Sequence, residues 1–155
     1  GLDSGPLGDP VAGPRFIDIP IYDVSLAAGA GGESNNDQIV DHYPLAETML
    51  ADLSVYPDNA AIVRIMGESM EPTLNCGDMV LVNTAIKKPI NNKIFAFVFD
   101  HNLRVKRFNH QLDRTWLIIS DNEDKNRYRD EIISPNNVNQ LNIVGQVVSI
   151  IQRNL

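Results

Sequence analysis

Short runs of β-branched and aromatic residues, separated by polar segments, dominate the later part of the chain. Apolar runs bounded by Gly, Asn, Asp and Pro are typical of β-strands. The run from Ile94 to Phe99 is apolar on both faces, which favours a central strand of a sheet. Asp100-His101-Asn102 follows it and predicts the turn of a hairpin. The expected strands cover residues 61–66, 79–83, 94–100, 103–108, 115–120 and 143–151.

The amino-terminal third has fewer such runs. Residues 16–26 form one strand-like run, in which isoleucines alternate with polar residues. Residues 27–37 are rich in Gly, Ala and Asn, a composition that predicts an exposed loop. One short helix is expected after Pro44, because apolar residues recur there at helical spacing. These residues are Leu45, Met49, Leu50 and Leu53. The pattern as a whole predicts a mainly β domain with one short helix.

The first residues differ in composition from the rest. Residues 1–14 contain four Gly and three Pro, which is typical of a linker. A chain of 155 residues suits a single domain. We therefore expect an interdomain linker over residues 1–15 and one folded domain over residues 16–155. Nothing before Phe16 has the pattern of a helical DNA-binding domain, so we expect such a domain to be absent from this chain.

The charge balance bears on DNA binding. The chain has 20 acidic and 13 basic side chains, which gives a formal net charge of −7. A surface of that sign repels phosphate instead of releasing its counterions. We predict that these residues alone have no useful affinity for duplex DNA. A gel-shift assay measures this directly, and tight, salt-sensitive binding would contradict it.

Composition and cysteine usage exclude several classes of protein. The chain is 43% hydrophobic and 21% charged, unlike a collagen-like or wholly disordered chain. The lone Cys76 allows neither an internal disulfide nor a cysteine zinc site. No apolar run approaches the roughly 20 residues of a membrane span. We expect a cytoplasmic protein that holds no cofactor and no metal ion.

The chemistry is concentrated around Ser69. This serine lies between Met66 and Met70, just after an expected strand and before Pro72. A serine becomes nucleophilic only beside a base. The three histidines, at positions 42, 101 and 110, have no spacing that ties them to Ser69. On chemistry alone, an ordinary turn serine is therefore the simpler interpretation.

Lys106 is the better candidate base. Strand alternation puts Lys106 on the same face as Arg104 and Phe108. An exposed lysine has a pKa of about 10.4 and is protonated at neutral pH, so lowering that pKa to near 7 costs about 4 kcal/mol. Burial among groups such as Met66, Met70 and Phe108 would supply that cost, because burial disfavours the ammonium. The alternative is a solvated strand lysine.

Three motifs resemble those of the self-cleaving LexA-like repressors, a group that includes phage lambda-type repressors and the UmuD mutagenesis protein. They are Gly-x-Ser-Met-x-Pro-Thr over residues 67–73, Gly-Asp-x-Val-x-Val over residues 77–82, and Val-Lys-Arg over residues 105–107. The resemblance runs from about Ile19 to Ile151. It implies the carboxy-terminal domain of these repressors, a fold of twisted antiparallel sheets. Signal peptidases share the serine box and the Lys-Arg strand, but they carry membrane spans.

The resemblance also implies a mechanism. Ser69 would be the nucleophile, Lys106 its general base, and the backbone amides of Glu68 and Ser69 the oxyanion donors. Family members cut their own chain at an Ala-Gly bond upstream of the serine. The matching bond here is Ala28–Gly29, although Ala30–Gly31 and Ala12–Gly13 offer the same dipeptide.

The resemblance finally implies a regulatory role. The chain would dimerise in a LexA-type or prophage transcriptional repressor, and self-cleavage, favoured by RecA filaments in the SOS response, would end repression. The alternative is a dimerisation module that does not cleave itself and is controlled by an antirepressor protein. Operator DNA would be bound only through the missing amino-terminal domain. The run Ile143–Ile151 is a candidate for pairing between two copies or, equally, an internal strand.

Overall fold

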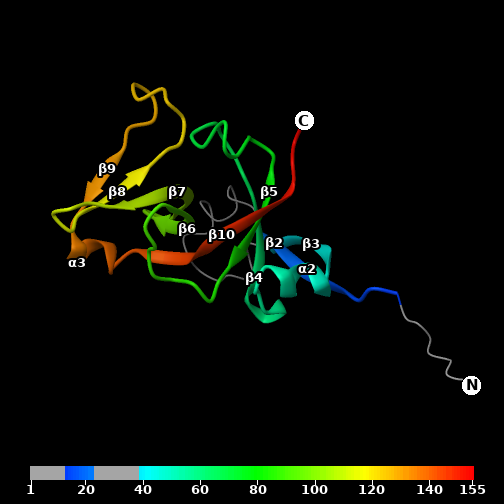
Figure 1. Ribbon diagram of the computed structural model, residues 1–155. Coiled ribbons are helices and arrows are strands. Elements are labelled where there is room, and N and C mark those ends of the chain that lie inside the picture. Colours follow the sequence, from blue (N-terminus) through cyan, green and yellow to red (C-terminus); the bar gives the residue numbers. More distant parts are fainter. Residues whose placement is uncertain (1–12, 23–38) are drawn as a thin grey trace, which may run out of the picture.

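The structure is a computed structural model that describes residues 13–22 and 39–155. One sheet of nine strands, in the order β3-β2-β4-β5-β10-β6-β7-β8-β9, forms the body of the domain (Figure 1). The strands are β2 (Phe16–Tyr22), β3 (Ile39–Ala46), β4 (Ala60–Arg64), β5 (Met79–Asn83), β6 (Lys93–Phe99), β7 (Asn102–His110), β8 (Trp116–Ile119), β9 (Glu131–Ile133) and β10 (Asn142–Gln152). The helical segments are α2 (Glu47–Asp52), α3 (Pro135–Val138) and the 3-10 turn η2 (Pro57–Asn59). The predicted mainly β fold is confirmed.

The long strand β10 joins two halves of the sheet. It pairs antiparallel with β6 through residues 142–146 and with β5 through residues 146–152. Figure 1 shows β10 running from the half that contains β6–β9 to the half that contains β2–β5 and α2. β10 therefore connects the two halves of the sheet through continuous backbone pairing.

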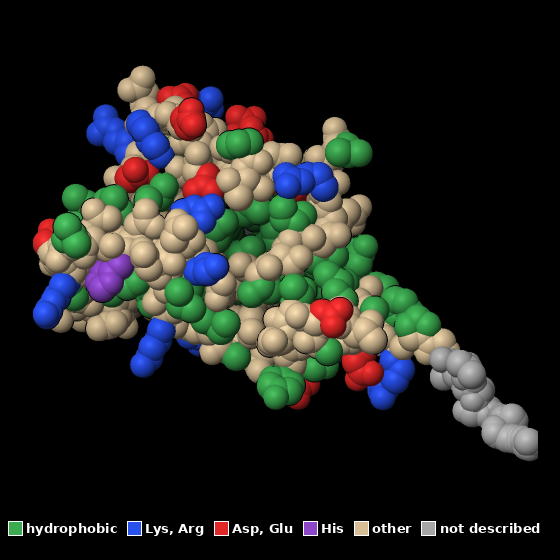
Figure 2. Space-filling view, in the orientation of Figure 1, with side chains coloured by type: hydrophobic (Ala, Val, Ile, Leu, Met, Phe, Trp, Pro, Cys, Tyr) green, Lys and Arg blue, Asp and Glu red, His purple; other side chains and the backbone are tan. Residues whose placement is uncertain are grey.

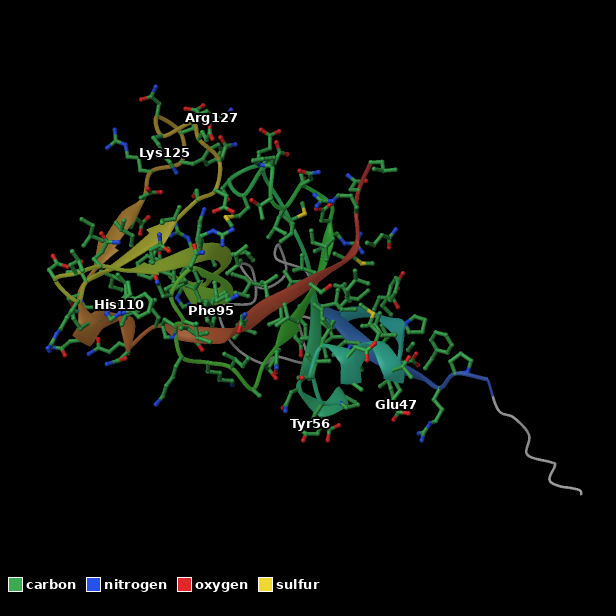
Figure 3. All side chains as sticks on the ribbon, viewed as in Figure 1. Glu47, Tyr56, Phe95, His110, Lys125 and Arg127 are labelled. Carbon is green, nitrogen blue, oxygen red and sulfur yellow. The ribbon has the colours of Figure 1, made fainter. Side chains whose placement is uncertain are left out.

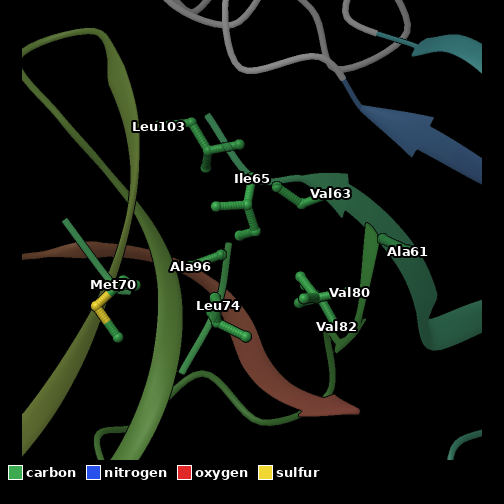
Figure 4. Close-up of a cluster of buried hydrophobic side chains, with 9 residues drawn as sticks. All are labelled: Ala61, Val63, Ile65, Met70, Leu74, Val80, Val82, Ala96 and Leu103. Carbon is green, nitrogen blue, oxygen red and sulfur yellow. The ribbon is translucent and has the colours of Figure 1, made fainter. Parts of the chain in front are cut away.

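Three clusters of buried hydrophobic side chains support the sheet. One lies between α2 and strands β2–β5 and includes Leu50 and Ile62. A second, under β6–β9, contains three phenylalanines in edge-to-face contact, with ring centroids 5.4 and 5.5 Å apart. The third lies at the centre and includes Ile65, Met70 and Leu103 (Figure 4). This central cluster joins the segment after β4 to β7.

Most predicted strands are found close to their expected places, as is the helix. The hairpin between β6 and β7 is also confirmed, because Phe99 pairs with Asn102 and leaves a two-residue turn. Both turn residues, Asp100 and His101, have positive φ angles, 53° and 66°. Two positive angles are the mark of the hairpin turn that matches strand twist. β6 lies between β10 and β7, as its two apolar faces predicted.

Other elements differ from expectation. Strand β3 was not predicted, because Asp41, His42 and Pro44 interrupt its apolar residues; it forms as an edge strand by pairing with β2. β9 and α3 were also missed, and β2 pairs parallel with β4. Cys76 is exposed. The end of the first expected strand, residues 23–26, lies outside the described residues. Across those that are described, the helices are too short to span a membrane.

Candidate active site

Ser69 lies on the β4–β5 loop, residues 65–78. Two backbone hydrogen bonds close this loop at its base, from Ile65 N to Asp78 O at 2.8 Å and from Gly77 N to Ile65 O at 2.7 Å. Gly77 has a φ of 93°, in the left-handed region that favours glycine. A side chain there would also meet Asn154 Nδ2 at 2.5 Å. The loop thus has a fixed base from which Ser69 projects.

Asp78 explains the Gly-Asp pair of the second motif. Its side chain is completely buried and accepts hydrogen bonds from the backbone N–H groups of Asn75 at 2.8 Å and Asn154 at 2.7 Å. Arg153 Nη1 completes the set at 3.1 Å. A buried carboxylate is tolerated when it is paired in this way. Asp78 therefore attaches the last residues of the chain to the base of the loop that carries Ser69.

Lys106 projects from the middle of β7. It pairs across the sheet with Phe95, which is fully buried, and Phe108 lies next on the same face. The Nζ of Lys106 donates a hydrogen bond to Ser120 Oγ at 2.8 Å, and Ser120 is only 3% exposed.

Its surroundings lower the pKa of Lys106 below the usual lysine value. Burial is the largest cause, and the positive charges of Arg104 and Lys125 act in the same direction. The carboxylates of Glu131 and Asp130 oppose the shift. A lysine with a lowered pKa is neutral over a wider pH range, which is what a general base requires.

Ser69 and Lys106 line the same small cavity, of about 140 Å³. Ser69 is half-buried there, and within the described residues no hydrogen bond joins it to Lys106. Met70, at 2% exposure, packs against this site as predicted, whereas Met66 is 52% exposed and covers little of it. The remaining lining residues are Ile65, Leu103, Arg104 and Val105.

The β8–β9 loop, residues 120–130, forms hydrogen bonds with both the serine loop and Lys106. Besides the bond from Lys106 to Ser120, Asn122 donates its backbone N–H to Ser69 O at 2.9 Å and its Nδ2 to Glu68 O at 2.8 Å. Figure 1 shows this loop beside the β4–β5 loop, and Figure 3 shows Lys125 and Arg127 on it, away from the body of the sheet. Figure 2 shows basic and acidic side chains gathered over this part of the surface. Sequence reasoning missed these contacts, because residues 121–131 are mostly polar and carry charges of both signs.

An ion pair holds the β8–β9 loop to β7. Arg107 binds Asp121 through two bonds, Nε to Oδ1 at 2.9 Å and Nη2 to Oδ2 at 2.7 Å. Burial alone would raise the pKa of Asp121, but hydrogen bonds from Arg107 and Thr73 and the nearby positive charges keep it below its usual value. Such two-bond pairs are stronger and more directional than single contacts. Arg107, the residue after Lys106, thus places the loop that contacts both candidate residues.

The other predicted residues divide into two groups. The amides of Glu68 and Ser69 bond no acceptor among the residues that the structure describes, and they stay available as candidate oxyanion donors. Ala28, Gly29, Ala30, Gly31 and Ala12 lie outside the described residues, so none of the three candidate bonds is seen. The three histidines are exposed and do not line the cavity. No group of three potential metal ligands occurs in the described ranges.

The comparison with known families decides the identity of the fold. The model of the Peptidase S24-like family matches residues 20–148, which include both candidate residues and the sheet that carries them. The chain belongs to the Peptidase S24-like family. The resemblance to LexA-like repressors is thereby confirmed, and membership supports the general class of serine peptidases.

Three curated relatives of this Peptidase S24-like chain are regulators or repressors by name. An uncharacterized HTH-type transcriptional regulator of Haemophilus influenzae is 34% identical over 129 residues, 81% of this chain and 53% of that protein. The 26 kDa repressor protein of Escherichia phage HK022 is 27% identical, with 86% and 57% covered. The HTH-type transcriptional regulator PrtR of Pseudomonas aeruginosa is 28% identical, with 84% and 52% covered. The chain therefore spans about half the length of these relatives.

Proposed function

We propose that this chain is the regulatory domain of a transcriptional repressor, which dimerises and inactivates itself by cutting its own backbone at Ala28–Gly29. The observation that carries the proposal is that Ser69 and Lys106 line one cavity, in which burial lowers the pKa of Lys106. The family match supports the peptidase class, and the names of the relatives support a role in repression.

In the proposed reaction, the neutral amine of Lys106 takes the proton of the Ser69 hydroxyl as its oxygen attacks the carbonyl carbon of Ala28. The amides of Glu68 and Ser69 stabilise the resulting oxyanion. The bond from Ala28 to Gly29 then breaks, and the Lys106 ammonium gives its proton to the departing amine of Gly29. Water hydrolyses the ester left on Ser69. A neutral amine has two N–H groups, so one can stay on Ser120 while the lone pair faces Ser69.

Alkaline pH is expected to start this reaction without a helper protein, because it increases the fraction of neutral Lys106. Incubation at pH values from about 7 to 10, followed by mass spectrometry, should show fragments 1–28 and 29–155. Ser69→Ala should remain intact. Gly29→Glu should also stay intact, because a bulky charged side chain hinders the entry of the bond. Fragments that persist in Ser69→Ala would indicate a contaminating protease.

One observation favours the second candidate, a dimerisation module that does not cleave itself and responds to an antirepressor protein. Lys106 donates its hydrogen bond to Ser120 Oγ at 2.8 Å rather than to Ser69. An intact wild-type chain after a day at high pH would support this candidate over self-cleavage. We propose that RecA filaments act on the cleaving protein by favouring its cleavable state over its resting state. A protein that never cleaves has no such state, so RecA filaments would not control it.

We also expect a homodimer in solution. Registered pairing of β10 with β6 ends at Gln146, and from Val147 to Gln152 β10 pairs with β5 alone among the described strands. The apolar side chains of this stretch are only half-buried. A strand edge next to apolar residues is suited to pairing with a second copy across a two-fold axis. Light scattering at high micromolar concentration should give twice the chain mass of 17.2 kDa, and a species of 17.2 kDa would contradict the prediction.

A further inference from the structure

The β8–β9 loop contacts the two candidate catalytic residues with different groups. Ser120 accepts a hydrogen bond from the Lys106 side chain, whereas Asn122 contacts only backbone carbonyls of the serine loop. Asn122 Nδ2 donates to Glu68 O at 2.8 Å, and Asn122 N donates to Ser69 O at 2.9 Å. The loop is itself held to β7 by the two-bond pair of Arg107 with Asp121.

The bond to Glu68 O determines how one particular amide is oriented. The carbonyl of Glu68 and the N–H of Ser69 belong to the same peptide group, and this peptide is trans. A trans peptide is planar and directs its C=O and its N–H to opposite sides. With its oxygen held by Asn122, the peptide turns the Ser69 N–H away from the β8–β9 loop. The second bond, to Ser69 O, holds the following peptide in the same way.

We infer that Asn122 is a positioning residue that orients the Ser69 amide as an oxyanion donor; the inference rests on the proposed function. Among the described residues, the Glu68 carbonyl accepts one other hydrogen bond, from Glu71 N at 3.2 Å, which is longer than the 2.8 Å bond from Asn122. That bond comes from within the serine loop itself, so Asn122 supplies the shorter bond and the only one in this set that fixes the peptide relative to the β8–β9 loop. An oxyanion donor acts only when it is already aimed at the developing charge, so its orientation affects the rate directly.

The surroundings of Asn122 make a selective test possible. Its Oδ1 accepts a hydrogen bond from Asp124 N at 2.9 Å, which shapes the turn of the loop. Asn122→Asp keeps this acceptor and the backbone bond but replaces the Nδ2 donor by an oxygen, which cannot donate to Glu68 O. Asn122→Ala removes both side-chain bonds. The two variants share only the loss of the Nδ2 donor. Asn126→Ala, at an exposed asparagine of the same loop, is the matched control.

The experiment measures the rate of self-cleavage of the full chain against pH, together with thermal unfolding. Asn122→Ala should lower the maximal rate by about 10- to 100-fold, somewhat less than the removal of an oxyanion donor. The pH at which the rate is half-maximal should not move, because Asn122 does not contact the Lys106 amine. Asn122→Asp should lower the maximal rate at least as much, and Asn126→Ala should match the wild type. Ser120→Ala is the contrasting variant, expected to move the half-maximal pH because its hydroxyl contacts the amine itself.

The possible failures are distinguishable. If the wild type cleaves and Asn122→Asp cleaves at the same maximal rate, the inference is wrong while the proposed function stands. A loss of rate in Asn122→Ala that is restored in Asn122→Asp would also overturn it, because the turn at Asp124 would then be the cause. If the wild-type chain does not cleave at any pH, both the proposed function and the role of Asn122 are overturned.

Discussion

Replacement of Lys106 by methionine is expected to stop self-cleavage at every pH, because methionine fills similar space but accepts no proton. General bases typically contribute about 10²- to 10⁴-fold to a rate, and the only other basic side chain among the described residues that line the cavity is Arg104, whose guanidinium has no acceptor atom. Mass spectrometry of fragments from about pH 7 to 10 tests this. Lys93→Met, at an exposed lysine of the neighbouring strand, is the control and should cleave normally.

The same substitution should change how stability depends on pH. The folded-state pKa of Lys106 lies below its unfolded value, so between the two values the unfolded chain binds more protons. The free energy of unfolding therefore rises with pH in that window, by at most about 1.4 kcal/mol per pH unit. At pH values below the window, the charged Lys106 destabilises the fold. Lys106→Met lacks this dependence. The free energy of unfolding can be measured with denaturant for Ser69→Ala and for the double variant Ser69→Ala/Lys106→Met. As pH rises, the protein with lysine should become more stable relative to the protein with methionine. A constant difference would mean that the pKa of Lys106 is not lowered.

The success of the strand predictions has a physical basis. β6 and β7 carry apolar residues on faces that pack against other elements, so their own residues contain the signal for a strand. The residues of β3 do not contain such a signal, because only Leu45 of that strand is buried. Its backbone bonds come from β2, a partner that no local pattern of β3 identifies. An edge strand formed by its neighbour is the kind of element that a reading of the sequence misses.

The candidate site was predictable where it lies in a motif. Ser69 and Lys106 stood in segments with recognisable spacing, and the structure brings both to one cavity. Ser120 and Asn122 were not predictable, because they belong to a polar loop far from Ser69 in sequence. Their contacts depend on the register of β7 and β8, in which Arg107 pairs with Ile119 and so brings Ser120 beside Lys106. Register between strands is set by the whole sheet and is not contained in any one segment.

Gly145→Ala is expected to destabilise the domain strongly, because β10 passes very close to β5 at this point. A Cβ at Gly145 would clash with Asn83 O and lie 2.8 Å from Asn83 C, both backbone atoms of β5. A backbone cannot move aside as the end of a flexible side chain can. Overpacking of this kind costs about 1–3 kcal/mol, and the backbone clash favours the upper end. For a domain of this size, that corresponds to a fall of about 6–12 °C in Tm.

The effect should extend to the candidate site. Gly145 lies where the register of β10 shifts against β6, next to the point at which the strand passes from β6 to β5. A displacement there would move the half that carries Lys106 relative to the half that carries Ser69. Self-cleavage of Gly145→Ala should therefore fall even at temperatures where the variant stays folded. Gly13→Ala is the control, since a Cβ at Gly13 meets nothing within 4 Å. Equal melting temperatures for the two variants would show that β10 and β5 separate there at little cost, and that this crossing does not hold the two halves in place.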